Sequence, residues 1–201
     1  MELRLPKGTK DVLSEEKILQ DFIVSTLEKT FQKYGFLPLD TPTLEMFDIL
    51  SSKYAGGEEI LKETFKLKDQ GNRELGLRYD LTVPLARFIA MNPQIKFPFK
   101  RYQIGKVFRD GPVSSNRIRE FLQVDTDIVG ARTFLAYAEI IAMTSEIFQQ
   151  LDIPVVIRIN NIKVLNSIIK ESNISDQSAI LTIDKLDKIG LDGVIKELLE
   201  R

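Results

Sequence analysis

The residues of this chain that are best suited to chemistry lie between Lys100 and Gly130. In the second half of this stretch alternate residues separate into two sets, because an extended strand points successive side chains to opposite faces. The mainly apolar set is Ile118, Leu122, Val124, Thr126 and Ile128. The mainly polar set is Arg117, Arg119, Phe121, Gln123, Asp125 and Asp127. The pattern predicts a strand with one face toward a core and one face available to a ligand.

A second, weaker strand pattern runs from Tyr102 to Arg109. It places Ile104 and Phe108 on one side, and the opposite side carries Gln103, Gly105, Val107 and Arg109. Turn-forming residues separate the two patterns: Gly111, Pro112, Ser114, Ser115 and Asn116. The simplest interpretation is an antiparallel hairpin with a long loop.

The polar face offers both cations and hydrogen-bond acceptors. Four arginines lie in or near the expected strands: Arg78, Arg109, Arg117 and Arg119. A guanidinium binds phosphate or carboxylate in a bidentate manner. Asp80, Asp125, Asp127 and Gln123 could accept from an ammonium group, and Phe121 could stack on a flat ring. Such a site suits a ligand with an ammonium at one end and phosphates or a carboxylate at the other. The alternative is that the arginines and aspartates pair with each other across strands.

Composition restricts the classes of function. The chain has 201 residues, of which 43% are hydrophobic and 28% charged, so we expect one globular domain, or one with a small appendage. A net charge of −1 gives no overall attraction to nucleic acid. The absence of cysteine and histidine excludes thiolate metal sites, and Ser-His-Asp or Cys-His catalysis, within this chain. The charged first residues do not resemble a signal peptide, and no apolar run approaches ~20 residues. We therefore expect a cytoplasmic protein without membrane contact.

The periodicity of apolar residues predicts the supporting elements. For residues 14–34 it predicts an amphipathic helix with Ser14 as N-cap and Gly35 as C-cap, and with Ile18, Phe22 and Phe31 on the apolar side. The other expected elements are an extended segment over 36–44, helices around 45–50, 83–91, 133–151 and 163–170, a hairpin of 64–68 with 74–79, a loop and short helix over 54–60, a strand over 155–159, and short helices over 184–188 and 192–201. Asp80 and Thr82 fall where a strand gives way to a helix, so they could bind a ligand or simply cap the helix.

The segment from Lys100 to Gly130 closely resembles motif 2 of class II aminoacyl-tRNA synthetases, most closely of the histidyl-tRNA synthetase group. The resemblance covers nearly the whole chain, in the order of the family: KGTKD, a motif 1 segment over about residues 34–45, GGEEI, LRYDLT, VVIRINN and DKLDKIG. It implies an α+β fold in which an antiparallel sheet is flanked by helices. It also implies a homodimer that forms through motif 1, where Pro42 fits an interface strand.

The resemblance implies a histidine–tRNA ligase, in which ATP, accompanied by magnesium, activates histidine to histidyl-adenylate before transfer to tRNA. Arg109 would contact the α-phosphate and the histidine carboxylate as the catalytic residue, and ATP would also meet Arg117 and Phe121. The histidine-binding residues would be Asp80, Thr82 and Gln123 at the α-ammonium group and Asp127 at the imidazole ring. No metal bound by the protein itself is expected.

Two features depart from the pattern of the family. The glutamate expected two residues after the motif 2 arginine is replaced by Gly111, and the end of the loop reads Asn116-Arg117-Ile118-Arg119. Residues 1–201 are expected to be a partial catalytic domain without motif 3 or an anticodon-binding domain, and to be inactive alone. The alternative is a non-catalytic, synthetase-like regulatory or interaction subunit, such as a regulator of histidine biosynthesis.

Overall fold

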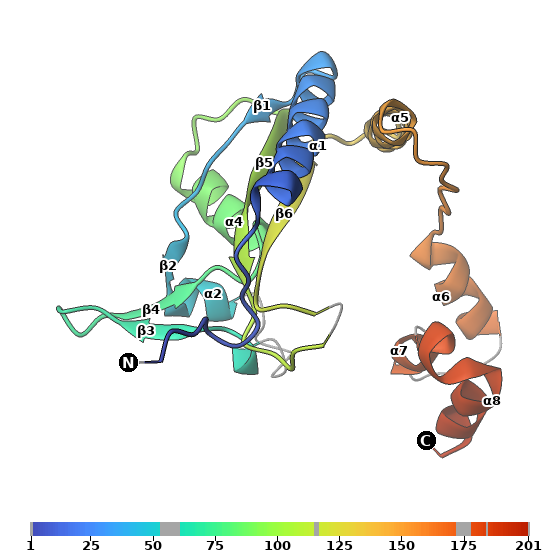
Figure 1. The fold of residues 1–201 in the computed structure, drawn as a ribbon. Helices are drawn as coiled ribbons and strands as arrows, with labels where there is room; N and C mark the ends of the chain where they lie inside the picture. Colours follow the sequence, from blue (N-terminus) through green and yellow to red (C-terminus); the bar gives the residue numbers. More distant parts are fainter. Residues whose placement is uncertain (1, 53–60, 115–116, 172–177, 184, 201) are drawn as a thin grey trace. The chain divides into compact units, whose positions relative to one another are not determined.

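The computed structural model describes residues 2–52, 61–114, 117–171, 178–183 and 185–200. The chain divides into two compact units, Met1–Val155 and Val156–Arg201 (Figure 1). Some predictions fall outside the described residues: those for the segment 54–60, Ser115, Asn116 and Asp184. Helices and strands are mixed in the first unit, so the predicted α+β class is confirmed. No helix among the described residues has the length and apolar character needed to span a membrane.

The predicted hairpin is the centre of the first unit. It consists of β5 (Phe99–Phe108) and β6 (Glu120–Val129), which pair in antiparallel register over ten residue pairs, from Phe99 with Val129 to Phe108 with Glu120. The first strand begins three residues earlier than the predicted Tyr102. β1 (Leu37–Pro38) joins the free edge of β5 in parallel orientation, which gives the sheet order β1-β5-β6.

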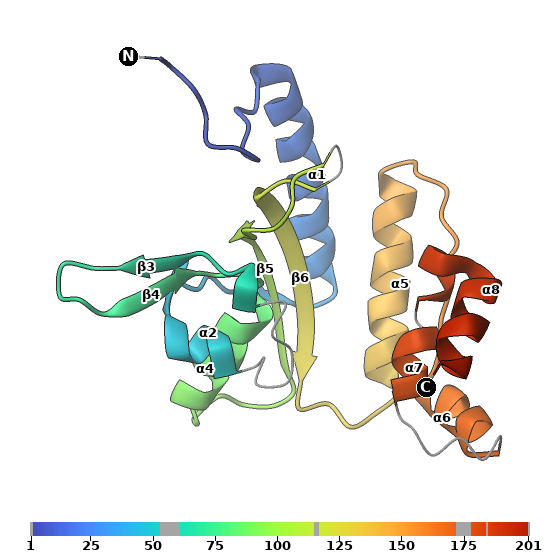
Figure 2. The same ribbon diagram turned by 90° about the horizontal axis from the view of Figure 1, so that it is seen from below.

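Helix α1 (Ser14–Lys33) packs on one face of this sheet, and α2 (Phe47–Ser52) and α4 (Thr82–Met91) lie on the opposite side (Figure 2). The core between α1, the sheet and α5 (Leu135–Gln150) contains Phe31, Phe36, Tyr102, Met143 and Ile147. A left-handed Gly35, with φ of 75°, follows α1 as predicted. Two details of that prediction are wrong. Ser14 is the first helical residue and Leu13 is the N-cap, while Ile18 and Phe22 remain 70% and 58% exposed.

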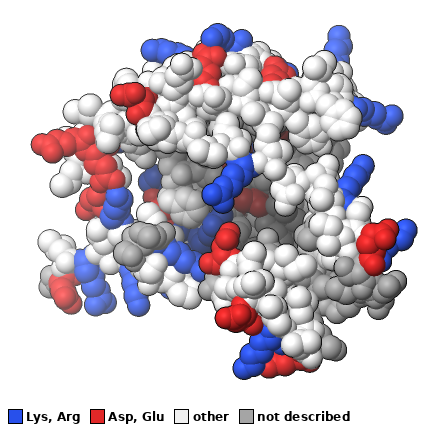
Figure 3. All heavy atoms as spheres, turned by 90° about the vertical axis from the view of Figure 1, so that its right-hand side faces the viewer, with Lys and Arg blue, Asp and Glu red and all other residues white. Residues whose placement is uncertain are grey.

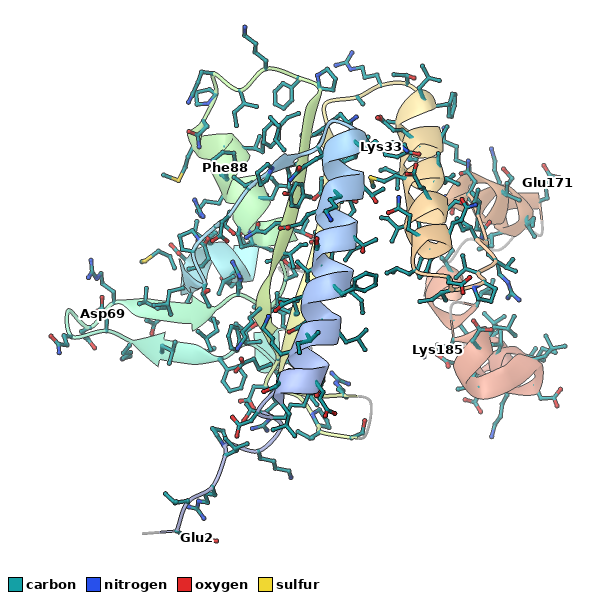
Figure 4. The ribbon with its side chains drawn as sticks, turned by 45° about the horizontal axis from the view of Figure 1, so that its top comes forward. Glu2, Lys33, Asp69, Phe88, Glu171 and Lys185 are labelled. Carbon is teal, nitrogen blue, oxygen red and sulfur yellow. The ribbon has the colours of Figure 1, made fainter. Side chains whose placement is uncertain are left out.

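A second sheet of order β2-β4-β3 lies beside α2 and contains the other predicted hairpin. It is built from β2 (Leu44–Met46), β3 (Lys66–Lys68) and β4 (Glu74–Leu77), all antiparallel. The β3–β4 turn carries Asp69, labelled in Figure 4, and a left-handed Asn72. The helix expected over 45–50 begins at Phe47, because residues 44–46 pair with β4 instead. Pro42 lies between β1 and β2.

The second unit is helical. It contains α6 (Ile162–Glu171), α7 (Ser178–Ile183) and α8 (Leu186–Leu199), the last of which is kinked at Gly190, with φ of 70°. The predicted helix over 163–170 is confirmed, whereas α7 was not predicted. The predicted strand over 155–159 is wrong, because these residues pair with no strand in the described part of the chain and Val156 is 86% exposed. An apolar run without a pairing partner does not form a sheet.

Candidate functional site

The polar face predicted from the sequence exists, on the side of the β5–β6 hairpin away from the Phe31–Tyr102 core. Residues directly opposite each other in an antiparallel pair share a face of the sheet. The register therefore aligns four pairs along this face: Arg101 with Asp127, Gln103 with Asp125, Gly105 with Gln123, and Val107 with Phe121. The hairpin thus brings Phe121, Gln123 and Asp127 together with a residue that the sequence did not single out, Arg101.

Arg101 is the buried cation of this face. Its side chain has no exposed surface, and Nη2 lies 2.6 Å from Asp127 Oδ2 and 4.0 Å from Asp125 Oδ2. The contact with Asp127 is an ion pair rather than a well-directed hydrogen bond, since that oxygen has no hydrogen-bond partner among the described residues. Nη2 also donates a hydrogen bond of 3.3 Å to the carbonyl of Leu81.

 
The sequence pattern missed Arg101 because the predicted strand begins at Tyr102, one residue after it, whereas β5 begins at Phe99. Continuing the alternation of Gln103, Gly105 and Val107 by two residues toward the N-terminus identifies Arg101 as a member of the polar face.

Burial and ion pairing have opposite effects on the pKa of the Asp127 carboxyl. Burial raises the pKa of Asp127 above its usual value, the Arg101 guanidinium lowers this pKa, and the nearby Asp125 raises it further. The side chain remains 32% exposed, so a ligand can reach it from solvent while its Oδ2 atom faces Arg101. The predicted ring-binding residue is therefore accessible, but it already has a cationic partner.

Gln123 and Asp125 are joined by a hydrogen bond of 2.9 Å from Gln123 Nε2 to Asp125 Oδ1. Both side chains are only partly buried and lie on the same face of β6 as Asp127. The structure thus brings two of the side chains expected to accept from an ammonium group next to the carboxylate expected at the ring.

Asp80 and Thr82 lie at the start of α4, and the sequence suggested either ligand binding or helix capping for them. Asp80 Oδ1 accepts hydrogen bonds from the backbone N–H groups of Thr82, at 3.0 Å, and Val83, at 2.9 Å. The capping interpretation is therefore confirmed for Asp80, while the Thr82 side chain is exposed. Asp80 also lies close enough to Arg101 for its negative charge to favour the charged form of the guanidinium. A third carboxylate thus approaches Arg101 from outside the hairpin.

Arg109 lies between two aromatic rings. Its guanidinium carbon is 4.5 Å from the centre of the Tyr79 ring and 4.9 Å from that of Phe121. Such cation–π contacts hold an arginine in place without consuming its hydrogen-bond donors, and Arg109 Nε has no hydrogen-bond partner among the described residues. Two of the three residues expected at the nucleotide, Arg109 and Phe121, are therefore in contact, and Tyr79 completes an arrangement that was not predicted from the sequence.

Arg117 and Arg119 both have acidic partners. The carboxylate of Glu63 binds Arg117 Nη2 and accepts a hydrogen bond of 3.2 Å from the Tyr79 hydroxyl. Arg119 Nη2 lies 3.0 Å from Asp110 Oδ1. A Cβ atom on Gly111 would lie 2.8 Å from Glu63 Oε1, so the glycine leaves room for that carboxylate. Both loop arginines therefore have acidic partners, but neither pair joins two strands as the pairing alternative described, and Glu63 was not predicted as a partner.

Arg78 is a structural residue rather than a member of the polar site. It is 4% exposed and donates hydrogen bonds to the carbonyls of Lys106, at 2.8 Å, and Thr41, at 2.7 Å. A Cβ atom on Gly105 would lie 2.3 Å from Arg78 Nη2. The glycine in β5 is therefore required for this arginine to cross the strand.

The site combines two chemical regions on one sheet face. One contains the carboxylates Asp80, Asp125 and Asp127 around Arg101, and the other contains the Tyr79–Arg109–Phe121 stack. Figure 3 shows another side of the molecule, on which Lys and Arg side chains lie scattered among Asp and Glu side chains. No group of three or more acidic residues in the described ranges is arranged to hold a metal ion. The cation among the carboxylates is the guanidinium of Arg101.

Comparisons with known proteins agree on one family. The family model described as histidyl-tRNA synthetase matches residues 8–198. A curated relative, histidine–tRNA ligase 1 of Bacillus cereus, is 53% identical over 204 aligned residues, which cover 100% of this chain and 48% of the relative. The chain therefore spans about half the length of the curated relatives it matches.

Two solved structures share the fold. The crystal structure of histidyl-tRNA synthetase from Nostoc sp. PCC 7120 matches with a TM-score of 0.84 and 35% identity, over 100% of this chain and 45% of that chain. A Bacillus halodurans protein, described as an ATP phosphoribosyltransferase regulatory subunit/histidyl-tRNA synthetase, matches with a TM-score of 0.64 and 27% identity, over 73% of this chain and 37% of that chain. The first description names a synthetase, and the second names a regulatory subunit together with a synthetase.

Proposed function

The chain belongs to the histidyl-tRNA synthetase family, and from this premise we propose that it forms part of a histidine–tRNA ligase. In this reaction a histidine carboxylate oxygen attacks the α-phosphorus of ATP, the bond to the β-phosphate breaks, and pyrophosphate leaves. The histidyl group of the adenylate then passes to tRNA, the bond between its carbonyl carbon and the phosphate breaks, and AMP leaves. The observation that carries the proposal is that one sheet face holds accessible carboxylates beside an arginine stacked on an aromatic ring.

The carboxylate region suits histidine. Asp127 is partly exposed and can accept a hydrogen bond from an imidazole N–H, which would favour histidine over an apolar side chain. Gln123, Asp80 and Thr82 are the groups that we assign to the α-ammonium. Asp80 is fixed by the two backbone amides at the start of α4, so its position is set before the ligand arrives.

The aromatic region suits ATP. Arg109 would stabilise negative charge that develops on the α-phosphate, and a cation already fixed by Tyr79 and Phe121 needs little rearrangement to do so. We assign Phe121 to the base of the nucleotide and Arg117 to its outer phosphates. Magnesium would arrive with ATP, whose phosphates supply the ligands that this ion prefers.

We further propose a cytoplasmic homodimer that acts on tRNA, with the segment 34–45 at the subunit interface. This segment contains β1 and the start of β2, and its apolar residues Leu37 and Leu44 are 64% and 49% exposed. Exposed apolar side chains on short strands are suited to burial against a second copy.

The second candidate function is a non-catalytic regulatory subunit. The ion pair between Glu63 and Arg117 favours this candidate, because the arginine that we assign to the outer phosphates already binds a carboxylate of the protein. A protein that binds histidine without using ATP would have no need to release this arginine.

Calorimetric titration separates the two candidates. The 201-residue chain is titrated with histidine, with lysine and glutamine as controls, and then with ATP and magnesium. A ligase predicts saturable binding of histidine and of ATP, and weaker binding of the control amino acids. Binding of histidine without ATP would support the regulatory subunit, and failure to bind histidine at millimolar concentration would overturn both.

A further inference from the structure

We propose that Arg101 is a positioning residue: it holds the Asp127 carboxylate charged and oriented so that this carboxylate can accept a hydrogen bond from the ligand. The inference deepens the proposed function and rests on it for the identity of the ligand. Arg101 itself is fully buried, so it cannot touch a ligand and acts only through its neighbours.

The bonding of Arg101 differs from that of the other buried arginine on this face. Arg78 is held by two short hydrogen bonds to backbone carbonyls, as expected of an arginine that stabilises a fold. Arg101 has one hydrogen bond of 3.3 Å, to Leu81, and its Nε and Nη1 atoms are buried without a partner among the described residues. Burying a guanidinium is costly, and unmade hydrogen bonds add to that cost. Stability alone therefore gives a poor account of Arg101.

The surroundings of Arg101 account for its charge. The charged groups that face it are Asp125 and Asp127 from β6 and Asp80 from the segment before α4. Its hydrogen bond to Leu81 connects it to the same segment, next to Asp80. One cation thus links the strand assigned to the ligand ring with the junction assigned to the ligand ammonium.

The direct consequence concerns Asp127. Burial and the neighbouring Asp125 both favour the neutral form of its carboxyl, and Arg101 is the group that opposes them. Without this arginine the carboxyl would keep its proton to higher pH, and the site would lose a charged acceptor. Asp127 would also lose the contact between its buried Oδ2 atom and Arg101, which fixes the orientation of the carboxylate.

The first test follows the titration of Asp127 itself, without ligand. Side-chain carboxyl carbons of 13C-labelled aspartate are observed by NMR across pH, with the Asp127 signal assigned by its loss in Asp127→Asn. Arg101→Met should move the Asp127 midpoint to higher pH. Arg78→Met removes an equally buried arginine from the same face and should leave the midpoint in place. An unchanged midpoint in folded Arg101→Met would overturn the inference, whether or not histidine binds.

The second test measures histidine affinity from pH 5 to 9 as the ratio of variant to wild type, which cancels the titration of the ligand. Arg101→Met should weaken binding on the order of tenfold near neutral pH, with a smaller loss at high pH, where Asp127 ionises again. A loss that does not depend on pH would indicate a structural role and overturn the inference. Failure of wild type to bind histidine would instead reject the proposed function.

A conservative variant covers the case in which Arg101→Met does not fold. Arg101→Lys retains the charge, but a lysine ammonium cannot reproduce the planar fork of a guanidinium. We expect its Asp127 midpoint to lie above that of wild type and its histidine affinity to fall by several-fold. Wild-type values for both quantities would show that the guanidinium does not position Asp127.

Discussion

The guanidinium of Arg109 lies 4.9 Å from the centre of the Phe121 ring. Two side chains that we assign to ATP are therefore in contact with each other when no nucleotide is bound. Tyr79 covers Arg109 from another side, with its ring centre at 4.5 Å. A base that stacks on Phe121 must therefore use a ring surface that Arg109 leaves open, or displace the arginine. Either way, the arginine and the ring are expected to respond together when ATP binds.

Arg109→Lys should weaken the binding of ATP with magnesium. Lysine keeps the charge but loses the planar group that stacks between Tyr79 and Phe121 and that binds phosphate in a bidentate manner. We expect a loss of about 1–3 kcal/mol, measured by calorimetry. The control is Arg73→Lys, in the β3–β4 hairpin, where Arg73 pairs with Asp69 (Figure 4) and ATP affinity should not change. Equal affinities in wild type and Arg109→Lys would remove Arg109 from the nucleotide site.

Asp127→Ala should weaken histidine binding by about 1–3 kcal/mol, because a partly buried acceptor of the imidazole N–H is lost. The matched control is Glu120→Ala, on the same strand, where the glutamate pairs with the exposed Lys106. Its histidine affinity should remain at the wild-type value. If the two variants bind histidine equally well, Asp127 does not select the ring.

The hairpin could be predicted from the sequence because its signal is local. Alternation over β6 indicated both the strand and the residues on each face, and the register confirms that Phe121, Gln123 and Asp127 share one face. The apolar run over residues 155–159 does not form the predicted strand, because a strand also requires a partner, and a local run of apolar residues says nothing about partners.

The partners of the site arginines could not be predicted because they come from distant parts of the chain. Glu63 is 54 residues from Arg117, and Leu81 is 20 residues from Arg101. A sequence pattern shows that an arginine needs a partner, but only the packing of α4 and the second sheet against the hairpin decides which one. For this reason Arg78 was predicted as a ligand-binding candidate and is found bonded to backbone carbonyls.

Gly105→Ala should destabilise the first unit without direct contact to a ligand. The added Cβ would lie 2.3 Å from Arg78 Nη2, so the buried arginine would have to leave its carbonyl partners. Overpacking of this kind costs about 1–3 kcal/mol, measured by urea unfolding. Gly71→Ala, where the nearest atom would be Asp69 Oδ1 at 3.3 Å, is the control and should cost clearly less. Equal losses would show that Arg78 can move without penalty.

The contact between α1 and α5 should depend on pH through Glu146. Its carboxylate accepts hydrogen bonds from Lys33 Nζ, at 2.6 Å, the Tyr34 hydroxyl, at 3.0 Å, and Gln150 Nε2, at 2.9 Å; Lys33 is labelled at the end of α1 in Figure 4. The hydrogen bond from Lys33 is the main cause that lowers the pKa of Glu146 below its usual 4.5. A carboxyl whose pKa is lower in the folded chain than in the unfolded chain stabilises the fold at a pH above its unfolded pKa. This contribution disappears as the pH falls through its folded pKa.

Glu146→Gln should therefore lower the urea midpoint at pH 7, and the difference from wild type should disappear as the pH falls below the folded pKa of the carboxyl. The control is Asp21→Asn, which removes an exposed ion pair with Lys17 within α1 alone. Its effect at pH 7 should be smaller, because exposed pairs within one helix contribute little. A difference between Glu146→Gln and wild type that stays constant down to acidic pH would mean that the glutamine disturbs packing, and that the charge of Glu146 does not hold α5 against α1.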